Sequence, residues 1–293
     1  MTIAGFCWAG RASSNVAGWD TFRAMARRAT SGARRGKSAD LSADNERLRA
    51  EIAERRRAEA LRDEFLSIAA HELKTPLTSL RGFAQLLMRQ LDKEEVPDPM
   101  RLRQGLSAID QQSAKLARLV SQLLDVSRID AGRLELDRKV ADVVGVVEDV
   151  VTTARVNTFR HEFTVRAPSG ALALVDPLRL EQVVRNLVDN AIRYSPDGGP
   201  ITIEVEKSRE AGVVTIAVGD RGLGVPRKHR GRIFDRFHQA HPERAMGGMG
   251  LGLYISRQIV ELHGGRIEAE YPVQGGTRMV VTLPTGAPAG KSE

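Results

Sequence analysis

The amino-acid sequence predicts an α+β fold in which an antiparallel helical hairpin is followed by an α/β sandwich. Two long series of apolar residues with heptad spacing predict the hairpin. After residue 132, short apolar runs typical of strands alternate with helical patterns, and this mixed order favours helices packed on one sheet. The chain is 42% apolar but only 4% aromatic, so we expect a core of aliphatic side chains.

The hairpin is predicted over residues 64–131. In each of its helices mostly apolar residues recur at alternating spacings of four and three, which places them on one face; the second series includes two serines. The first series is Leu66, Ala70, Leu73, Leu77, Leu80, Ala84, Leu87 and Leu91, and the second is Leu102, Leu106, Ile109, Ser113, Leu116, Val120, Leu123 and Ser127. Pro97 and Pro99 indicate a turn between them. Two helices cover such faces only partly, so we expect a homodimer in which two hairpins form a four-helix bundle.

The rest of the chain divides by composition. Residues 1–39 are rich in Ala, Gly, Ser and Arg without periodicity, and we expect a disordered basic leader there. Residues 40–63 are mostly charged with a thin apolar seam, which indicates a charged helix or a short coiled coil. The sandwich is predicted over residues 135–285, and residues 286–293 are expected to form a flexible tail.

The net charge of +7 lies mostly in the leader, because residues 1–37 carry seven basic side chains and one acidic one. Such a leader could touch an anionic membrane or nucleic acid, although a solvated segment is the simpler interpretation. The remaining chain is nearly neutral, which argues against nucleic-acid binding by the core. The single cysteine, Cys7, excludes an internal disulfide and a multi-cysteine metal site. No apolar run is long enough for a transmembrane segment, and no secretory signal is present, so we expect a cytoplasmic protein.

A polar group stands out in the first helix, within the stretch AAHELKTPLTSL at residues 69–80. With Ala70 at heptad position a, His71, Glu72 and Thr75 face away from the bundle core. Glu72 can accept a ring proton from His71 and so raise the nucleophilicity of the other ring nitrogen. Pro76 offers no N–H to the carbonyl of Glu72, so we expect a bend there. An inert exposed histidine is the alternative, whereas a metal site is disfavoured because no second ligand stands one turn away.

Two further patterns lie in the predicted sandwich. Asn186 and Asn190 stand four residues apart on one helix face, where two amide oxygens can hold a hydrated Mg²⁺; a pair of surface amides is the alternative. Asp220 ends an apolar strand, and Gly222 and Gly224 after it let the backbone approach a flat ring closely.

A run of glycines then opens the last predicted helix. It consists of Gly247, Gly248, Gly250 and Gly252. Glycine-rich backbone at a helix N-terminus offers N–H groups and a positive dipole end to phosphate. Each loop alone is a weak signal, but the ordered set of amides, Asp-x-Gly-x-Gly and a glycine-rich helix start favours a nucleotide site.

The stretch FLSIAAHELKTPLTSL resembles the histidine box of bacterial two-component sensor histidine kinases, whose pattern is His, Glu, any, any, Thr, Pro. The resemblance implies that His71 is the phosphoacceptor, Glu72 its acid–base partner and Thr75 the residue needed for phosphatase activity. It also implies a response-regulator receiver domain as partner and a signalling role for the charged helix over residues 40–63.

RNLVDNAIRYSPDGG, DRGLGVP, IFDRFHQ and GGMGLGLYIS resemble, in this order, the asparagine, first glycine, phenylalanine and second glycine boxes of that family's ATP-binding domain. The resemblance covers about residues 60–284 and implies ATP and Mg²⁺ as cofactors. It implies that Asn186 and Asn190 position Mg²⁺, that Asp220 reads adenine, that Tyr194 packs on the base and that Arg193 lies near the phosphates. The nucleotide loops would contribute Gly222, Gly224, Gly248, Gly250, Leu251 and Gly252. Met249 departs from the Thr common in the family, which removes a hydroxyl that could touch phosphate.

Two other functions are compatible with parts of this pattern. Gyrase-like or chaperone-type ATPases share the nucleotide fold, but they place a Glu where this chain has Asn186, and an amide cannot take a proton from water. A catalytically inactive dimeric scaffold is the other alternative, and a measurement of ATP binding would separate it from the kinase. A P-loop is excluded, because no Gly-x-x-x-x-Gly-Lys-Ser/Thr string occurs.

Overall fold

The structure, a computed structural model, describes residues 16–92, 98–208, 210–242 and 248–286. It divides into two compact units, residues 1–64 and 65–293, and each is considered by itself. Helix α1 (Val16–Leu91) runs through the boundary and continues unbroken through Pro76. Within the described ranges, no helix is both long enough and apolar enough to cross a membrane.

The helix begins much earlier than the sequence predicts. The leader expected to be disordered over residues 1–39 is helical from Val16 onward, and residues 1–15 lie outside the described part. The physical reason is composition, because Ala and Arg are among the residues that favour helix most, and here they outnumber the glycines. Absence of an apolar periodicity therefore did not mean absence of a helix.

The predicted hairpin is formed by the C-terminal part of α1 and by helix α2 (Pro99–Asp130). Helix α2 begins with the N-cap Asp98, whose side chain accepts a hydrogen bond from the N–H of Met100. The two helices approach closely at Gly105, where a Cβ atom would lie 2.7 Å from Cδ2 of Leu87. The turn predicted around Pro97 falls mostly on residues 93–97, which lie outside the described residues.

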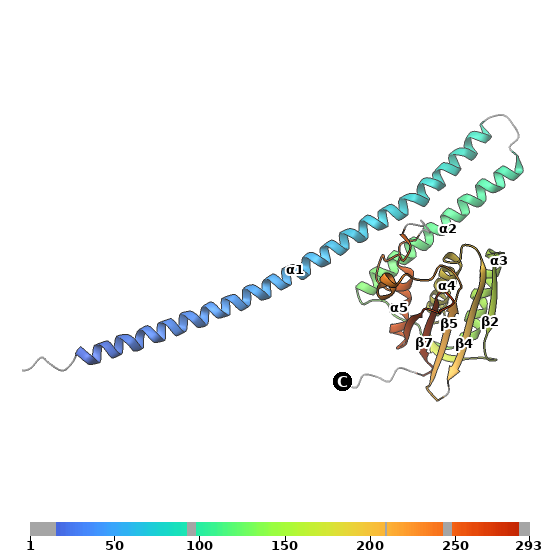
Figure 1. Cartoon of the computed structure of the whole chain (residues 1–293). Helices are drawn as coiled ribbons and strands as arrows, with labels where there is room; N and C mark the ends of the chain where they lie inside the picture. Colours follow the sequence, from blue (N-terminus) through green and yellow to red (C-terminus); the bar gives the residue numbers. More distant parts are fainter. Residues whose placement is uncertain (1–15, 93–97, 209, 243–247, 287–293) are drawn as a thin grey trace, which may run out of the picture. The chain divides into compact units, whose positions relative to one another are not determined.

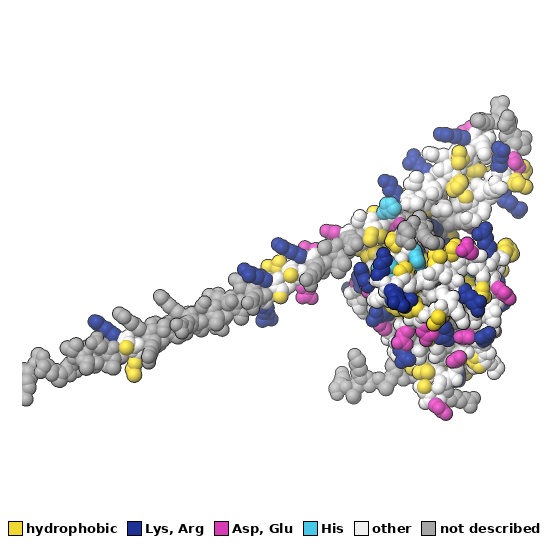
Figure 2. All heavy atoms as spheres, in the orientation of Figure 1, with side chains coloured by type: hydrophobic (Ala, Val, Ile, Leu, Met, Phe, Trp, Pro, Cys, Tyr) yellow, Lys and Arg dark blue, Asp and Glu magenta, His cyan; other side chains and the backbone are white. Residues whose placement is uncertain are grey.

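The two heptad series divide into an inner and an outer set. Four members of each series are half-buried within the hairpin, namely Leu73, Leu80, Ala84, Leu87, Leu102, Ile109, Leu116 and Leu123. The other large apolar members are exposed, namely Leu66, Leu77, Leu91, Leu106 and Val120. Figure 2 shows hydrophobic side chains on the surface of the hairpin. One hairpin therefore covers only half of each series.

The sandwich follows in the same unit, with helices on one face of a sheet (Figure 1). The sheet has the order β2-β4-β5-β7-β6, with β2 and β4 parallel and all other neighbours antiparallel. Its strands are β2 (His161–Arg166), β4 (Gly199–Ser208), β5 (Val213–Gly219), β6 (Arg266–Glu270) and β7 (Arg278–Pro284). The helices are α3 (Val143–Asn157), α4 (Pro177–Arg193) and α5 (Gly252–Leu262), and a short 3-10 helix, η1, spans Arg227–Arg232. A separate antiparallel pair joins β1 (Lys139–Asp142) to β3 (Leu172–Val175).

The core between sheet and helices is aliphatic, as the composition predicts. Val147, Leu187, Ile201, Ile216 and Ile259 are among its fully buried side chains. The opposite face of the sheet carries a ladder of charges in place of a second helical layer. Such a one-sided sheet is typical of an α+β fold and leaves the helices free to carry the polar site.

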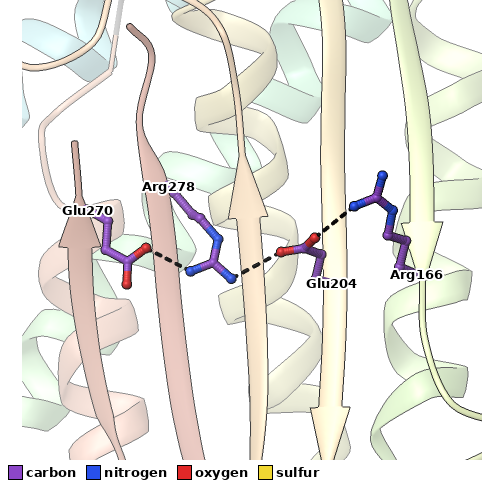
Figure 3. A network of polar contacts seen from close by, with 4 residues as sticks. All are labelled: Arg166, Glu204, Glu270 and Arg278. Atoms are coloured by element: carbon purple, nitrogen blue, oxygen red, sulfur yellow. Dashed lines mark hydrogen bonds and ion pairs between the residues drawn. The ribbon is translucent and has the colours of Figure 1, made fainter. Parts of the chain in front are cut away.

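The ladder of charges crosses the sheet from β2 to β6 (Figure 3). Glu204 accepts hydrogen bonds from Arg166 at 3.2 Å and from Arg278 at 3.0 Å, and Arg278 also donates to Glu270 at 2.7 Å. Arg278 reaches across β5 at Gly219, its register partner, which has no side chain to block it. The alternating charges satisfy one another on the exposed face without apolar cover.

Candidate functional site

Helix α4 positions the two predicted asparagines. It begins at Pro177 after the N-cap Asp176, whose carboxylate accepts hydrogen bonds from the N–H groups of Leu178 and Arg179 at 3.1 Å. Its apolar face is buried against the sheet and the neighbouring helices, so its polar face is held in one direction. Asn186 and Asn190 lie on that face one turn apart.

Asn186 is fixed by contacts with helix α5. Its Nδ2 donates a hydrogen bond to Oγ of Ser256 at 2.9 Å, and Ser256 is buried. Its Oδ1 lies where a Cβ atom on Gly252 would approach to 2.1 Å, so only glycine fits beside it. The start of α5 and the asparagine face of α4 are therefore in direct contact.

A polar pocket of about 970 Å³ lies at this contact. Asn186, Asn190 and Arg193 line it from α4, and the glycine-rich start of α5 lines it with Gly248, Met249, Gly250, Leu251 and Gly252. Gly248 has φ +108°, and a Cβ atom there would lie 2.8 Å from Nη1 of Arg193, so glycine is required by both backbone and space. Amide oxygens, backbone N–H groups and a guanidinium are the groups that bind phosphates and their Mg²⁺.

A second, mostly apolar pocket of about 590 Å³ adjoins the first. The two share five lining residues, Asn190, Tyr194, Ile233, His238 and Leu253, and so form one site with two ends. The apolar end is lined by Leu187, Ala191, Val218, Val225 and Met279, with Asp220 as its acidic group. This shape fits a nucleotide, with the base between apolar walls and the phosphates at the polar end.

Asp220 is oriented by the backbone around it. Its Oδ1 accepts hydrogen bonds from the N–H groups of Gly222 at 2.8 Å and Thr277 at 3.3 Å, which leaves Oδ2 for a ligand. Burial raises the pKa of Asp220, and these two hydrogen bonds partly oppose the rise. Gly222 and Gly276 permit the arrangement, because a Cβ atom on either would lie 2.0 Å from a backbone oxygen, that of Tyr194 or of Asp220.

The remaining predicted nucleotide residues also gather here. Tyr194 lines both pockets, and its ring lies 6.0 Å from the ring of His241, centroid to centroid. Gly224 lines the apolar pocket with φ +64°. Met249 is buried in the hydrophobic core, so the residue that replaces Thr packs its thioether inward. Gly247 lies outside the described residues.

The histidine group lies apart from these pockets, on α1. The His71 side chain is 79% exposed, whereas that of Glu72 is only 24% exposed, and Nδ1 of His71 lies 3.5 Å from Oε1 of Glu72. Thr75 is exposed as well, and its hydroxyl donates a hydrogen bond to the carbonyl of His71 at 3.2 Å. Neither pocket is lined by these three residues. The site therefore has two halves, a nucleotide-shaped pocket and a solvent-facing imidazole.

Several residues of the site were missed by the sequence analysis. His238 and His241 line the apolar pocket from the segment after η1, and Ser256 orients Asn186. Lys115 and Arg118 of α2 line the polar pocket. His238 and Ser256 stand within the quoted stretches IFDRFHQ and GGMGLGLYIS, so a local signal for them was present. No local signal marks His241, Lys115 or Arg118, which reach the pockets only through the tertiary fold.

Comparison with known proteins agrees with this geometry. Residues 61–132 match the family model described as the His Kinase A (phospho-acceptor) domain. Residues 175–287 match the model described as histidine kinase-, DNA gyrase B-, and HSP90-like ATPase. The first match covers the hairpin with His71, and the second covers the asparagine helix and both glycine loops.

Sequence relatives belong to the same group. The chain is 30% identical over 240 residues to the sensor histidine kinase WalK of Bacillus subtilis and 35% identical over 242 residues to the alginate biosynthesis sensor protein KinB of Pseudomonas aeruginosa. Each alignment covers 80% of this chain but only 38% and 39% of the respective relative. The chain thus spans about two fifths of the length of these relatives.

Solved structures of histidine kinases are similar in fold over most of this chain. The Acinetobacter baumannii histidine kinase AdeS matches with a TM-score of 0.54 and 25% identity, over 73% of this chain and 98% of that one. The histidine kinase ThkA, solved in complex with the response regulator TrrA, matches with a TM-score of 0.53 and 25% identity, over 76% and 61%. With a phospho-acceptor hairpin and this ATPase domain in order on one chain, the protein belongs to the two-component sensor histidine kinases.

Proposed function

We propose that this chain is an ATP-dependent protein-histidine kinase that phosphorylates His71 and passes the phosphoryl group to an aspartate of a response-regulator receiver domain. The observation that carries the proposal is the pairing of a two-ended nucleotide pocket with a histidine that is exposed and backed by a carboxylate. The receiver partner is supported by the relative ThkA, which was solved in complex with a response regulator. Phosphatase activity toward the same partner is part of the proposal, through Thr75.

The position of Glu72 indicates which ring nitrogen of His71 reacts. Oε1 of Glu72 faces Nδ1, so a proton held on Nδ1 leaves the lone pair on Nε2. In the proposed step a bond forms between Nε2 and the γ-phosphorus, the bond from that phosphorus to the bridging oxygen breaks, and ADP leaves. The carboxylate of Glu72 stabilises the positive charge that the ring acquires.

The nucleotide half of the reaction depends on positioning. Asn186 and Asn190 would hold Mg²⁺, which supplies charge neutralisation at the phosphates. Arg193 and the backbone N–H groups from Gly248 to Gly252 bind the phosphates, and Oδ2 of Asp220 accepts a hydrogen bond from the exocyclic amine of adenine. Met249 contributes packing and no hydroxyl, so these backbone donors carry the binding at the loop.

An ATPase of the gyrase or chaperone type is the competing function, since one family description includes both. Asn186 argues against it, because its amide donates to Ser256 and cannot act as a general base toward water. The phospho-acceptor domain, matched separately, argues in the same direction. The expected cytoplasmic location stays a prediction.

Incubation with γ-³²P-ATP and Mg²⁺ tests the proposal. The native chain is expected to acquire label in a bond stable to alkali and labile to acid, as a phosphorus–nitrogen bond would be. His71→Gln should abolish the label and retain ATP binding, because the exposed side chain of His71 contributes little to folding. Undiminished labelling of His71→Gln would refute the assignment, and release of inorganic phosphate without labelled protein would favour the ATPase.

A further inference from the structure

Helix α2 contributes basic side chains to the polar pocket of the nucleotide site. Lys115 and Arg118 line this pocket together with Leu119 and Gln122, which continue the same helix face. Across from them lie the asparagines of α4 and the glycine-rich start of α5. The polar pocket is therefore completed by the hairpin, although both nucleotide motifs belong to the sandwich.

The contact between α2 and the sandwich is firmly held. Asp125 of α2 is buried and accepts hydrogen bonds from Arg179 at 2.8 Å and Gln182 at 2.7 Å, both on α4. Leu119 and Val126 are buried in the same hydrophobic core as the sandwich residues. Because Leu119 is anchored directly beside Arg118, the backbone of Arg118 is fixed at the pocket.

The partner of Arg118 in this structure leaves its guanidinium available. Nη1 of Arg118 lies 3.8 Å from Oδ2 of Asp189, beyond hydrogen-bond distance, and the two side chains are 66% and 42% exposed. An exposed pair at such a distance contributes little to stability. Burial raises the pKa of Asp189, and the positive charges of Arg118, Arg193 and Arg185 around it only partly oppose the rise. A region with this excess of positive charge favours an anion.

We propose that Arg118 of α2 is a positioning residue for the triphosphate, its guanidinium donating hydrogen bonds to phosphate oxygens in the polar pocket, with Lys115 adding charge beside it. The inference rests on the proposed function, since it takes the polar pocket as the phosphate end of an ATP site. Guanidinium–phosphate hydrogen bonds are among the strong ones in proteins, because both partners are charged. Nucleotide binding is thereby linked to contact between α2 and the sandwich.

Equilibrium binding of MgATP and of adenosine to the whole chain tests the inference without a catalytic readout. Arg118→Ala should weaken MgATP binding by ~10-fold or more, the scale expected for one charge-assisted hydrogen bond, and leave adenosine binding unchanged. Arg118→Lys should restore part of the loss, because it keeps the charge. Arg103→Ala, an exposed arginine of α2 outside the pocket, should bind like the native chain.

Asp189→Asn separates a phosphate contact from a merely structural ion pair. It removes the partner of Arg118 together with a negative charge near the phosphates, so MgATP should bind at least as tightly as to the native chain. The inference would be overturned if Arg118→Ala bound MgATP like the native chain, or if Asp189→Asn weakened MgATP binding as much as Arg118→Ala does. It would also be overturned if Arg118→Ala lost as much affinity for adenosine as for MgATP. Absence of label on native His71 would instead refute the proposed function, and the binding constants would still decide the role of Arg118.

Discussion

Thr75 and Ser79 make the same local contact at different distances from His71. Each hydroxyl donates a hydrogen bond of 3.2 Å to the carbonyl four residues earlier, from Thr75 to His71 and from Ser79 to Thr75. Only Thr75 shares an exposed turn with the imidazole, so a receiver domain over His71 would also cover Thr75. The two residues therefore separate a role in the partner reaction from an effect on the helix.

Thr75→Ala is predicted to keep His71 labelling and to slow dephosphorylation of the phosphorylated receiver by ~10-fold or more, the scale expected for one lost hydrogen bond. The hydroxyl can orient a water toward the aspartyl-phosphate but has no necessary role at the nucleotide. Ser79→Ala removes an equivalent helix contact and is the matched control. Equal phosphatase rates for the native chain and Thr75→Ala would show that the threonine merely precedes Pro76, where helix is disfavoured anyway.

Asp220→Asn is predicted to shift the preference of the apolar pocket from adenine toward a base that carries a carbonyl oxygen in place of the exocyclic amine. Oδ1 is occupied by the N–H groups of Gly222 and Thr277, so the amide would place its Nδ2, a donor, where Oδ2 stood. A donor facing the exocyclic amine of adenine leaves both unpaired, which should weaken MgATP binding by ~10-fold or more. Inosine triphosphate carries a carbonyl oxygen at that position and should lose much less. Equilibrium binding measures both affinities. If the variant lost the same affinity for the two nucleotides, Asp220 would have no role in recognising the base.

A buried histidine connects the two helices that carry the nucleotide site. The N–H of Asp176, which caps α4, donates to Nε2 of His263 at 2.9 Å, and Nδ1 of His263 hydrogen-bonds to the carbonyl of Ile259 in α5 at 2.8 Å. Nε2 must therefore be unprotonated. Burial is the largest cause of a lowered pKa for His263, only partly opposed by its hydrogen bond with Ile259. The ring joins the start of α4 to the end of α5.

Because the pKa of His263 is lowered, the stability that this contact between α4 and α5 contributes depends on pH in a defined direction. A histidine held neutral in the fold contributes stability above its unfolded-state pKa, near ~6.5, and loses that contribution as the pH falls through the folded-state pKa. The free energy of unfolding of the native chain should therefore decrease from pH 7 to pH 5 more steeply than that of His263→Gln. At pH 7 the variant should be less stable by about 0.5–1.5 kcal/mol, because glutamine can replace the acceptor Nε2 but has no donor at the place of Nδ1, so the hydrogen bond to Ile259 is lost. Denaturant unfolding at several pH values measures both, and parallel curves would contradict the prediction.

At the scale of the whole molecule, the outer set of the heptad series needs a partner surface. Leu77 and Leu106 are 56% and 54% exposed in the single chain, although each belongs to one of the two heptad series. Their inner neighbours Leu73 and Leu116 are half-buried within the hairpin. A second hairpin would cover the outer set and complete a four-helix bundle. We therefore propose that the chain is a homodimer through this surface.

Leu77→Glu or Leu106→Glu should dissociate the dimer and leave each hairpin folded. Burying one leucine contributes about 1.5–3 kcal/mol, and a charge at the interface adds a desolvation cost, so the dissociation constant should rise by at least ~10-fold. Leu86→Glu, equally exposed but outside the heptad series, is the matched control. Light scattering would measure the mass of each variant. A native monomer, or dimers that persist in both variants, would contradict the prediction.

The sequence by itself determined the order of the elements and the direction of the local faces. Heptad spacing predicted the hairpin and an exposed His71, and a spacing of four placed Asn186 and Asn190 together on α4. Some glycine positions were readable too, since Gly224, Gly248 and Gly250 meet a local backbone demand with positive φ, whereas Gly222 and Gly252 are required by close tertiary contacts. Composition led to the wrong expectation of disorder for residues 16–39, which form a helix through intrinsic helix propensity although they show no apolar periodicity.

Only the tertiary structure decided how these faces meet. It divided each heptad series into inner and outer members, joined Asp176 to His263 and brought Arg118 of α2 to the polar pocket of α4 and α5. These contacts join residues far apart in the chain, and their partners carry no local mark. Periodicity determines which side of a helix is apolar, whereas the packing of a particular core determines what that side touches.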